Sequence, residues 1–488
     1  MKRYKLLLCL ISVVMTLLCG HVAASATVIS IVLEKAGGLS EKAGAEAFDI
    51  DSLILAGPMD KADFDALWYM ALKGKLSYLN LKNARPTDNE IPTDAFCHFG
   101  DQAYDFSGMI GVKRLPYLHT VILPENLKKI GAGAFSHTDI TSIDIPPTVE
   151  EIGQACFLAC WKLAGKVVIP EGVSRIEDST FQQCQNIQEV SLPSTLEYIG
   201  ISAFDACSKM TLSNSKLPAS VREMGAQAFY LTSAIKEIEL PAGLKIVPLA
   251  CFQASGIEKV VIPPSVQVIS DLAFQSCRSL KEIVFSEGVD RIAGQAFADD
   301  VSVEKIILPK SLSTAFNGAF ANMPNLKEVY SLGTTPPWMC SDLVNGGSDG
   351  SDTDDDTIDG LPRRICAFLG TTPRDIPVYV PVGSLKMYIN AGHGWGWFSD
   401  FRECKDMPQL QAGIEETFDK EETASTMVYA NSNEIIIACS SAPQQYAIYS
   451  LDGRMIASGI TNTDDTIISV SKGIYIVRVG RTSIKVIV

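Results

Sequence analysis

The residues that most resemble a catalytic or metal-binding motif gather in one short stretch, residues 346–360. Gly346-Gly-Ser348-Asp-Gly350 matches the G-x-S-x-G string of a nucleophilic serine. That chemistry needs a strand-to-helix turn with histidine and acid partners, whereas this serine lies among Gly and Asp residues typical of a loop. Residues 346–360 are therefore interpreted as an acidic polar loop, and no catalytic residue is predicted.

The aspartates of the same stretch imitate a calcium loop. Asp352, Asp354 and Asp356 have the spacing that opens an EF-hand. Thr357 stands where that loop needs glycine, and Arg363 stands where it needs a bidentate glutamate. A solvated acidic loop is the favoured interpretation, with weak calcium association as the alternative.

Metal and cofactor chemistry finds no other support in the sequence. Beyond residue 26 the histidines are His98, His119, His137 and His393, without an H-E-x-x-H string or a pair at ligand spacing. Eleven of the 13 cysteines also follow residue 26, and no two form a C-x-x-C pair. No metal site and no cofactor are predicted, and a hydrolase or metalloprotease is unsupported.

Most of these cysteines recur at fixed places relative to a phenylalanine. Cys160, Cys184, Cys207 and Cys277 each follow one by three residues, and Cys156 and Cys251 each precede one. A thiol that recurs at one register behaves as a small apolar core residue. Structural, buried cysteines are therefore expected rather than disulfides or ligands.

The phenylalanines belong to a repeat that organises residues 121–330. Short apolar runs end in proline, with Ser286 in its place once, at Pro124, Pro146, Pro170, Pro193, Pro218, Pro241, Pro263 and Pro309. Eleven residues after each of these nine positions stands a phenylalanine, from Phe135 to Phe320. The units are 22 to 25 residues long, so insertions fall between units. A fixed period of this size predicts a solenoid, mostly of β structure, with about nine units.

Within a unit, the residues three and one before the proline are apolar, as in Val260 and Ile262. Alternation of period two places both on the inner face of a strand. The string Leu/Ile-Pro-x-x-Leu/Val-x-x-Ile-Gly-x-x-Ala-Phe, as in residues 123–135, resembles the leucine-rich repeats of the BspA-like surface proteins of Bacteroidales. That resemblance implies adhesion to host or bacterial surface proteins. Ser286 and Ala315-Phe316 depart from the pattern and are expected to weaken pairing locally.

Flanking segments complete the expected domain plan. Residues 27–120 are interpreted as an N-terminal cap with degenerate first repeats, including strands at 27–33, 52–55 and 76–81 and a helix starting at Asp60. Residues 331–407 are interpreted as a C-terminal cap that carries the 346–360 loop and an aromatic lid. The lid residues are Tyr388, Trp395, Trp397 and Phe398.

The two ends suggest export. Residues 1–26 have the basic start, apolar core and small-residue cleavage site of a signal peptide, and no later stretch is apolar enough for a transmembrane helix. Residues 408–433 have a linker composition. Residues 434–488 form an expected β-sandwich that resembles the C-terminal sorting domain of type IX secretion, through its Leu-Asp-Gly-Arg hairpin and Gly-Ile-Tyr-Ile-Val-Arg-Val strand. A plain accessory sandwich is the alternative.

The net charge of the chain indicates which kinds of partner it is unsuited to bind. The net charge is −15, or −18 once the three basic residues of the leader are removed. Such acidity disfavours nucleic acid and anionic membranes, which bind clustered Lys and Arg. Secretion machinery and a protein ligand are the partners expected.

The candidate binding site is a surface. The residue two before each proline should point outward, and Val261, Val284 and Ile307 then form an exposed aliphatic row. The charged residues expected to flank this row are Lys259, Glu282 and Lys305. An apolar strip rimmed by charge is typical of protein-binding sites. Alternatively, these are ordinary strand residues, or the loop near Gly346 covers them.

The sequence thus favours a non-catalytic, exported binding or adhesion protein, secreted or on the outer cell surface. The alternative is a surface or periplasmic accessory protein that captures glycans or nutrients, which an exposed platform of Trp395 and Trp397 would favour.

Overall fold

The structure is a computed structural model that describes residues 28–97, 115, 117–316, 318–339, 357–358, 361–362, 366–392 and 394–410, with the strands of a C-terminal module between 426 and 487. The expected signal peptide and most of the 346–360 loop lie outside the described residues. The chain folds as two compact units, Met1–Ile414 and Glu415–Val488.

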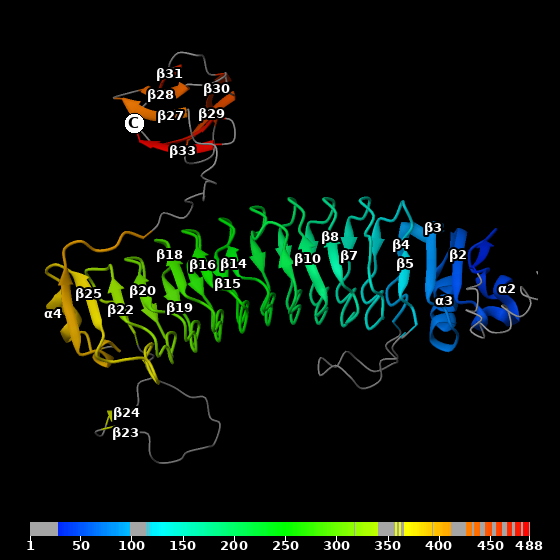
Figure 1. Cartoon of the computed structure of the whole chain (residues 1–488), viewed down its shortest axis with the longest axis horizontal. Coiled ribbons are helices and arrows are strands. Elements are labelled where there is room, and N and C mark those ends of the chain that lie inside the picture. The colour runs from blue at the N-terminus through cyan, green and yellow to red at the C-terminus, as the bar shows by residue number, and fades with distance from the viewer. Residues whose placement is uncertain are drawn as a thin grey trace, which may run out of the picture. The chain divides into compact units, whose positions relative to one another are not determined.

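The first unit begins with the N-terminal cap predicted from the sequence (Figure 1). Strands β1 (Val28–Val32), β2 (Ser52–Met59) and β3 (Tyr78–Pro86) pair in parallel and lead into β5 (Thr120–Ile122). Helix α3 (Lys61–Lys73) starts after Asp60, whose carboxylate accepts from the N–H groups of Ala62 (2.9 Å) and Asp63 (3.4 Å). Phe64, Leu67, Trp68 and Ala71, which lie on one face of this helix, are buried.

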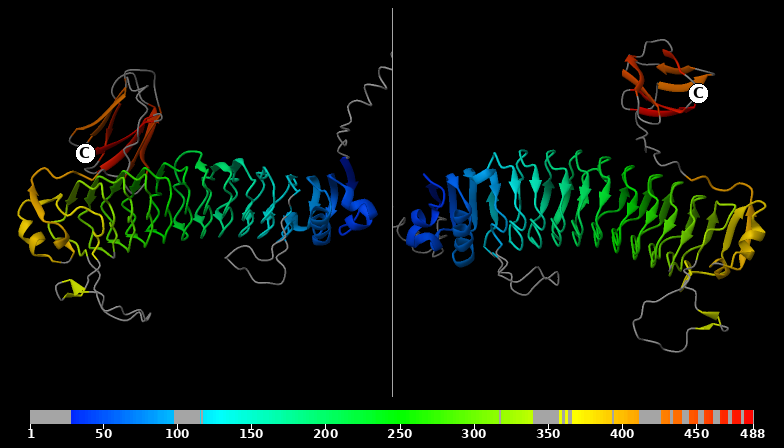
Figure 2. Two further views of the ribbon diagram at one scale, coloured as in Figure 1. Left: turned by 60° about the horizontal axis from the view of Figure 1, so that its bottom comes forward. Right: turned by 180° about the vertical axis from the view of Figure 1, so that it is seen from behind.

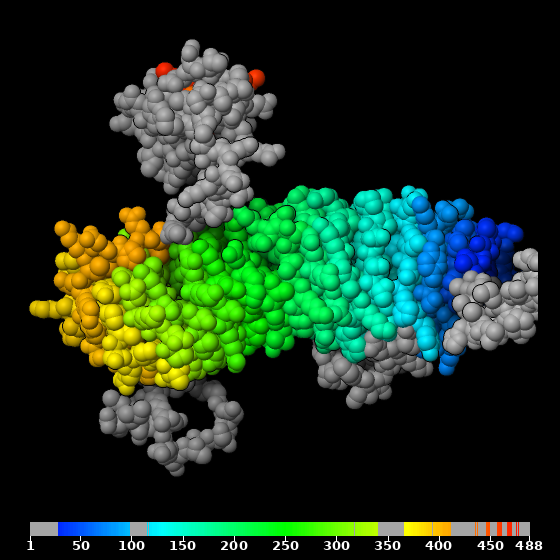
Figure 3. Space-filling model, viewed as in Figure 1, coloured from blue at the N-terminus to red at the C-terminus, as the bar shows by residue number. Residues whose placement is uncertain are grey.

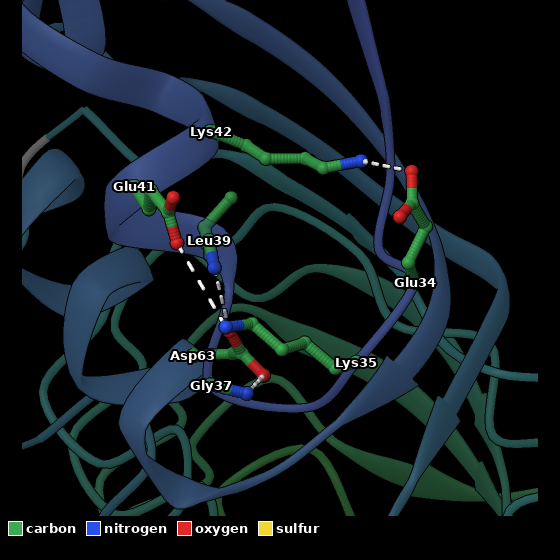
Figure 4. Close-up of polar contacts among 7 residues, drawn as sticks. All are labelled: Glu34, Lys35, Gly37, Leu39, Glu41, Lys42 and Asp63. Atoms are coloured by element: carbon green, nitrogen blue, oxygen red, sulfur yellow. Dashed lines mark hydrogen bonds and ion pairs between the residues drawn. The ribbon is translucent and has the colours of Figure 1, made fainter.

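A buried carboxylate ties this cap together (Figure 4). Asp63 accepts from the backbone N–H groups of Gly37 (2.7 Å), Leu39 (2.9 Å) and Asp60 (3.0 Å). Because a buried carboxylate needs several donors, this network holds the turn before α2 (Leu39–Ala43) against the start of α3. The ion pairs drawn beside it, such as Lys42 to Glu34 at 3.3 Å, are exposed and contribute little.

The repeats form the expected solenoid, with most units adding one strand to each of two parallel strand columns (Figures 1 and 2). The first column, after β5, contains β8 (Gly165–Val168), β10 (Ile187–Ser191), β12 (Thr211–Leu212), β14 (Glu237–Glu239), β16 (Lys259–Ile262), β18 (Glu282–Phe285), β20 (Lys305–Leu308), β22 (Glu328–Ser331), β25 (Pro377–Pro381) and β26 (Asp400–Cys404). The second column contains β4 (Glu90–Ile91), β6 (Lys129–Ile130), β7 (Glu151–Ile152), β9 (Arg175–Ile176), β11 (Tyr198–Ile199), β13 (Glu223–Met224), β15 (Ile246–Val247), β17 (Val268–Ile269), β19 (Arg291–Ile292) and β21 (Thr314–Ala315).

A ladder of stacked phenylalanine rings runs through the interior. Neighbouring rings from Phe96 to Phe368 lie 5.1 to 5.7 Å apart between centroids. The nine phenylalanines that follow the proline positions by eleven residues all stack, and Phe96, in the expected degenerate first repeat, stacks on Phe135. Phe368 extends the ladder beyond residue 330, because one further unit resumes at Cys366 after the segment that follows Met339; Ala367 N–H donates to Met339 O at 2.7 Å.

Each ring from Phe135 to Phe320 sits on a tight corner with two left-handed residues. Ala250 (φ 50°) and Ala254 (φ 54°) flank Phe252, and Leu272 (φ 60°) and Ser276 (φ 61°) flank Phe274. Non-glycine residues rarely adopt this conformation, so the repeat geometry overrides their local preference. The sequence did not indicate this feature.

The two departures from the repeat, at Ser286 and at Ala315-Phe316, differ in their effect on strand pairing. At Ser286 the backbone N–H donates to Ile262 O (3.1 Å), a bond that proline could not make, and β18 pairs with β16 over four residues. Pairing is instead lost on the other side of that strand, because β18 and β20 belong to separate sheets. At Ala315 pairing is kept, since β21 is in register with β19.

The C-terminal end of the solenoid is closed by aromatic residues, around α4 (Leu385–Asn390) and a short 3-10 helix, Trp395–Trp397. Buried Tyr388 donates to Gly333 O (2.6 Å), and buried Trp395 donates to Pro337 O (2.9 Å). Both side chains satisfy their polar atoms on the last repeat, as a lid requires.

The second unit consists of two antiparallel sheets, ordered β27-β28-β31 and β30-β29-β32-β33. Their strands are β27 (Thr426–Asn431), β28 (Glu434–Cys439), β29 (Gln445–Ser450), β30 (Met455–Ile460), β31 (Thr466–Ser469), β32 (Ile474–Val479) and β33 (Thr482–Ile487). The buried side chains include Ile435, Ile448 and Val477. Strand β27 lies within residues 408–433, so this segment is not wholly a linker and the module begins before Glu434.

Candidate binding surface

Alternation along the first strand column decides which side chains face outward. In β16, Val260 and Ile262 are buried in the core, and Val261 between them is partly exposed. Parallel pairing in register places Val261 beside Val284 of β18. Ile307 occupies the same alternating position in β20, between buried Ile306 and Leu308. The structure therefore places the three predicted residues on the outward side of three successive units.

The exposure of this row differs from the prediction. Val261 and Ile307 are only partly exposed, and Val284 is buried, with 9% of its surface accessible. In-register side chains of paired parallel strands lie about 4.8 Å apart, so Val261 of β16 shields Val284 from one side. The row is thus a closely packed apolar ridge rather than a set of freely exposed side chains.

Two tyrosines that the sequence reasoning missed continue the row. Ile307 pairs in register with Tyr330 of β22, and Tyr330 pairs with Tyr379 of β25. Their rings stack at 4.6 Å between centroids, and Lys305 Nζ lies 4.4 Å from the centre of the Tyr330 ring. The signals were present: Tyr330 follows Ile307 by one unit, and Tyr379 stands two residues before Pro381.

We call these five residues the outer strip: Val261, Val284, Ile307, Tyr330 and Tyr379. The Tyr330 hydroxyl donates to Glu328 Oε2 (3.1 Å). Burial, followed by the charge of Glu328, raises the pKa of Tyr330 to about 12. The tyrosine end of the strip therefore presents a neutral phenol at physiological pH.

Paired charges border the outer strip. Lys259 Nζ lies 3.1 Å from Glu282 Oε2, and Lys305 Nζ lies 3.1 Å from Glu328 Oε1. The residues that directly precede Lys259 and Glu282 form a second row with the reverse order of charges, in which Glu258 Oε2 lies 2.9 Å from Lys281 Nζ. The predicted flanking residues are thus neutralised by their neighbours one unit away.

The cysteines are structural, as predicted. Nine described cysteines are free, and the six at the repeat positions are buried. The thiols of Cys160 and Cys184 donate to carbonyl oxygens of Phe135 and Phe157, each at 3.0 Å, one unit earlier. Burial raises the pKa of the Cys184 thiol, which opposes the thiolate that nucleophiles and metal ligands require.

Neither a metal site nor a tryptophan platform is found among the residues that the structure describes. They contain no group of three or more His, Cys, Asp or Glu that could hold a metal ion. Trp395 is 1% exposed, and Arg374 lies over the Trp397 ring, 4.8 Å from its centre. The two tryptophans therefore do not form the exposed pair that would favour glycan capture.

Comparison with protein families shows which known repeats these units are similar to. Residues 113–212 and 208–327 match the BspA type leucine rich repeat region. The repeats are leucine-rich repeats of the BspA type. Residues 416–488 match a domain of unknown function (DUF6383), so the resemblance to a type IX sorting domain has no support from this comparison. No curated protein matches the chain. No helix in the described part is both long and apolar enough to span a membrane.

A search of solved structures found matches at low sequence identity. A leucine-rich repeat protein from Bacteroides ovatus is 17% identical, with a TM-score of 0.46, over 78% of this chain and 93% of its own. The pneumococcal vaccine antigen PcpA is 16% identical, with a TM-score of 0.37, over 72% of this chain and 79% of its own. A leucine rich cell surface protein from Faecalibacterium prausnitzii is 19% identical, with a TM-score of 0.28, over 58% and 74%.

Proposed function

We propose that the protein is an exported, non-catalytic solenoid that binds a protein ligand through the outer strip. The observation that carries this proposal is the unbroken outward column of apolar and aromatic side chains over β16, β18, β20, β22 and β25. Elsewhere the same column holds polar residues such as Asp144, Ser191 and Glu239. A contiguous apolar strip with tyrosines suits a protein interface better than a solvated sheet.

The chemistry of the strip supports a protein partner over a glycan. Sugar rings stack on open aromatic faces, whereas Tyr330 and Tyr379 cover each other and Lys305 covers the free side of Tyr330. Paired bordering charges give little long-range attraction, so contact area and shape should determine affinity. Binding is therefore expected to depend weakly on ionic strength.

Display on the outer cell surface belongs to the same proposal. It combines the leader in residues 1–26 with the all-β module at the C-terminus, which would engage the secretion machinery. The mass and protease accessibility of the protein on its native cells test this part. A surface-accessible product that starts near Thr27 and lacks the C-terminal module is expected, whereas a protected, full-length product would place the protein in the periplasm.

Binding is tested by a double substitution, Val261→Lys with Ile307→Glu, in the full chain. The probe is surface-protein extract from host epithelial and bacterial cells, untreated or treated with protease or glycosidase. The wild-type chain should capture protein that protease treatment removes, and the double variant should lose at least tenfold in affinity. Val168→Lys is the matched control, because Val168 has the same outward register in β8 and is 52% exposed.

Three results would count against the proposal. Equal capture by the double variant would exclude the outer strip as the site. Loss of capture in the Val168 variant alone would move the site to the N-terminal half of the sheet. Sensitivity to glycosidase but not to protease would favour glycan capture.

A further inference from the structure

Among the described residues, one of the buried carboxyl groups that belong to neither the outer strip nor the caps is that of Asp300. Asp300 is fully buried, and neither of its carboxyl oxygens has a hydrogen-bond partner. A carboxylate without donors in such a place is very unfavourable. The surroundings of Asp300 must therefore favour the protonated, uncharged carboxyl, or the buried charge must destabilise the fold.

The register of Asp300 indicates which state fits. It follows Phe297 by three residues, the place that Cys160, Cys184, Cys207 and Cys277 occupy in other units. Each of these thiols donates to the carbonyl oxygen of the phenylalanine one unit earlier, as Cys277 does to Phe252 O at 3.1 Å. The equivalent acceptor for Asp300 is Phe274 O, and only a protonated carboxyl could donate to it.

A second observation falls in the same unit. Sheet pairing along the first column is interrupted between β18 and β20, as it also is between β12 and β14, and Asp300 lies in the turn that leads into β20. The second column continues across this junction, with Arg291 opposite Thr314 and Ile292 opposite Ala315. Backbone hydrogen bonds also cross this junction at the phenylalanine corner, where Phe274 N–H donates to Ala296 O and Ser276 N–H donates to Ala298 O, each at 2.8 Å. Asp300 therefore lies between a hydrogen-bonded corner and two strands, β18 and β20, that do not pair.

We propose that Asp300 is a proton-dependent joint of the solenoid: its protonated carboxyl donates to Phe274 O and holds the β18–β20 junction, and loss of the proton loosens it. The joint lies between Val284 and Ile307, in the middle of the outer strip. It is a property of the fold, and its test does not require ligand binding.

The neighbouring groups set the direction of the pH effect. Burial raises the pKa of Asp300 well above its ordinary value, and the charge of Asp299 acts in the same direction. The backbone N–H of Cys277 acts to lower the pKa of Asp300, but its own hydrogen bond, at 3.1 Å, is to Phe274 O. The other residues at this register in the adjoining units are Cys277, whose thiol pKa is also raised by burial, and uncharged Met323.

The sign follows from linkage. The folded chain keeps a proton that the unfolded chain releases, so folding stability is highest below the unfolded pKa of Asp300. It falls as pH rises toward the folded pKa. Over that window the folding constant should fall up to tenfold per pH unit relative to a variant without the carboxyl.

The experiment compares the full-length wild type with Asp300→Asn and Asp300→Cys between pH 5 and pH 8.5. The amide and the thiol both donate without charge, and the thiol reproduces the neighbouring units. Urea unfolding and hydrogen exchange of residues 278–309 are measured at each pH. The wild type should lose stability relative to both variants as pH rises, with faster exchange confined to this junction, and its infrared spectrum should show one protonated carboxyl that Asp300→Asn lacks.

Asp290→Asn is the control, because Asp290 is exposed in the same unit. It should follow the wild type at every pH. If one variant fails to fold, the other still tests the pH dependence, and the infrared band of the wild type tests the proton directly. A constant stability difference between pH 5 and pH 8.5, or an ionised Asp300 at pH 6, would overturn the inference.

Discussion

Along each strand of the first column, neighbouring residues face either the interior or the solvent, and their sequences differ accordingly. Inside the solenoid, ring after ring at the corners of the units is phenylalanine, and thiols or hydroxyls recur three residues later. Outside, the column changes from Ile122 and Asp144 through Glu239 to the apolar outer strip. Each interior position meets the same neighbours in every unit, so one residue type fits throughout.

The outer positions have no such constraint, because each is bordered by solvent and by the unit on either side. Variation there is free, so a run of five similar side chains needs another reason than packing. Binding is such a reason. The interior and outer positions should then differ in what a substitution changes. Interior changes should alter stability, and outer changes should alter binding. Figure 3 shows the successive units as adjacent bands, each in contact with its neighbours in sequence.

The largest effect is expected inside the ladder. Phe252→Ala removes a fully buried ring that stacks at 5.4 Å on Phe229 and at 5.3 Å on Phe274. It should lower the free energy of unfolding by about 3–5 kcal/mol, since the surrounding units cannot fill the cavity. Urea denaturation followed by circular dichroism measures this loss. A change below about 1 kcal/mol would show that neighbouring units can collapse around the cavity.

A smaller loss is expected at the thiol ladder. Cys207→Ala removes a buried sulfur that donates to Phe181 O at 3.1 Å, and should cost about 1–2 kcal/mol of unfolding free energy. Burial raises the pKa of the Cys207 thiol, so the native protein should resist alkylation at pH 8. Mass spectrometry of alkylated peptides tests this. Rapid labelling of folded Cys207 would contradict the buried ladder.

The smallest effect is expected on the outer rim. Lys259→Ala breaks an exposed ion pair with Glu282 and should change the unfolding free energy by about 0–1 kcal/mol. Combined with Glu282→Ala, the double variant should show a coupling energy that shrinks further in high salt. Salt-dependent urea melts measure it. A coupling near the size of the Phe252 effect would remove the distinction between the interior and the rim.

Much of this division was predictable from spacing. The constant eleven residues from proline to phenylalanine place Phe135 through Phe320 at one position in every unit, and in the structure their rings stack. The recurrence of Cys184 and Cys207 at one register likewise predicted buried thiols. Phe368 was missed because the long segment after Met339 breaks the spacing along the chain without breaking the stack.

Exposure and protonation were decided by the tertiary structure. Val284 has the outward register that alternation predicts, yet it is buried, with Val261 in register beside it on the paired strand. Asp300 is an unremarkable acidic residue in the sequence, and only the stacking of units leaves its oxygens without partners. The sequence alone determined which side of a strand each residue faces, because that depends on local periodicity. How much solvent remains on that side depends on neighbours one unit away, and only the folded chain supplies them.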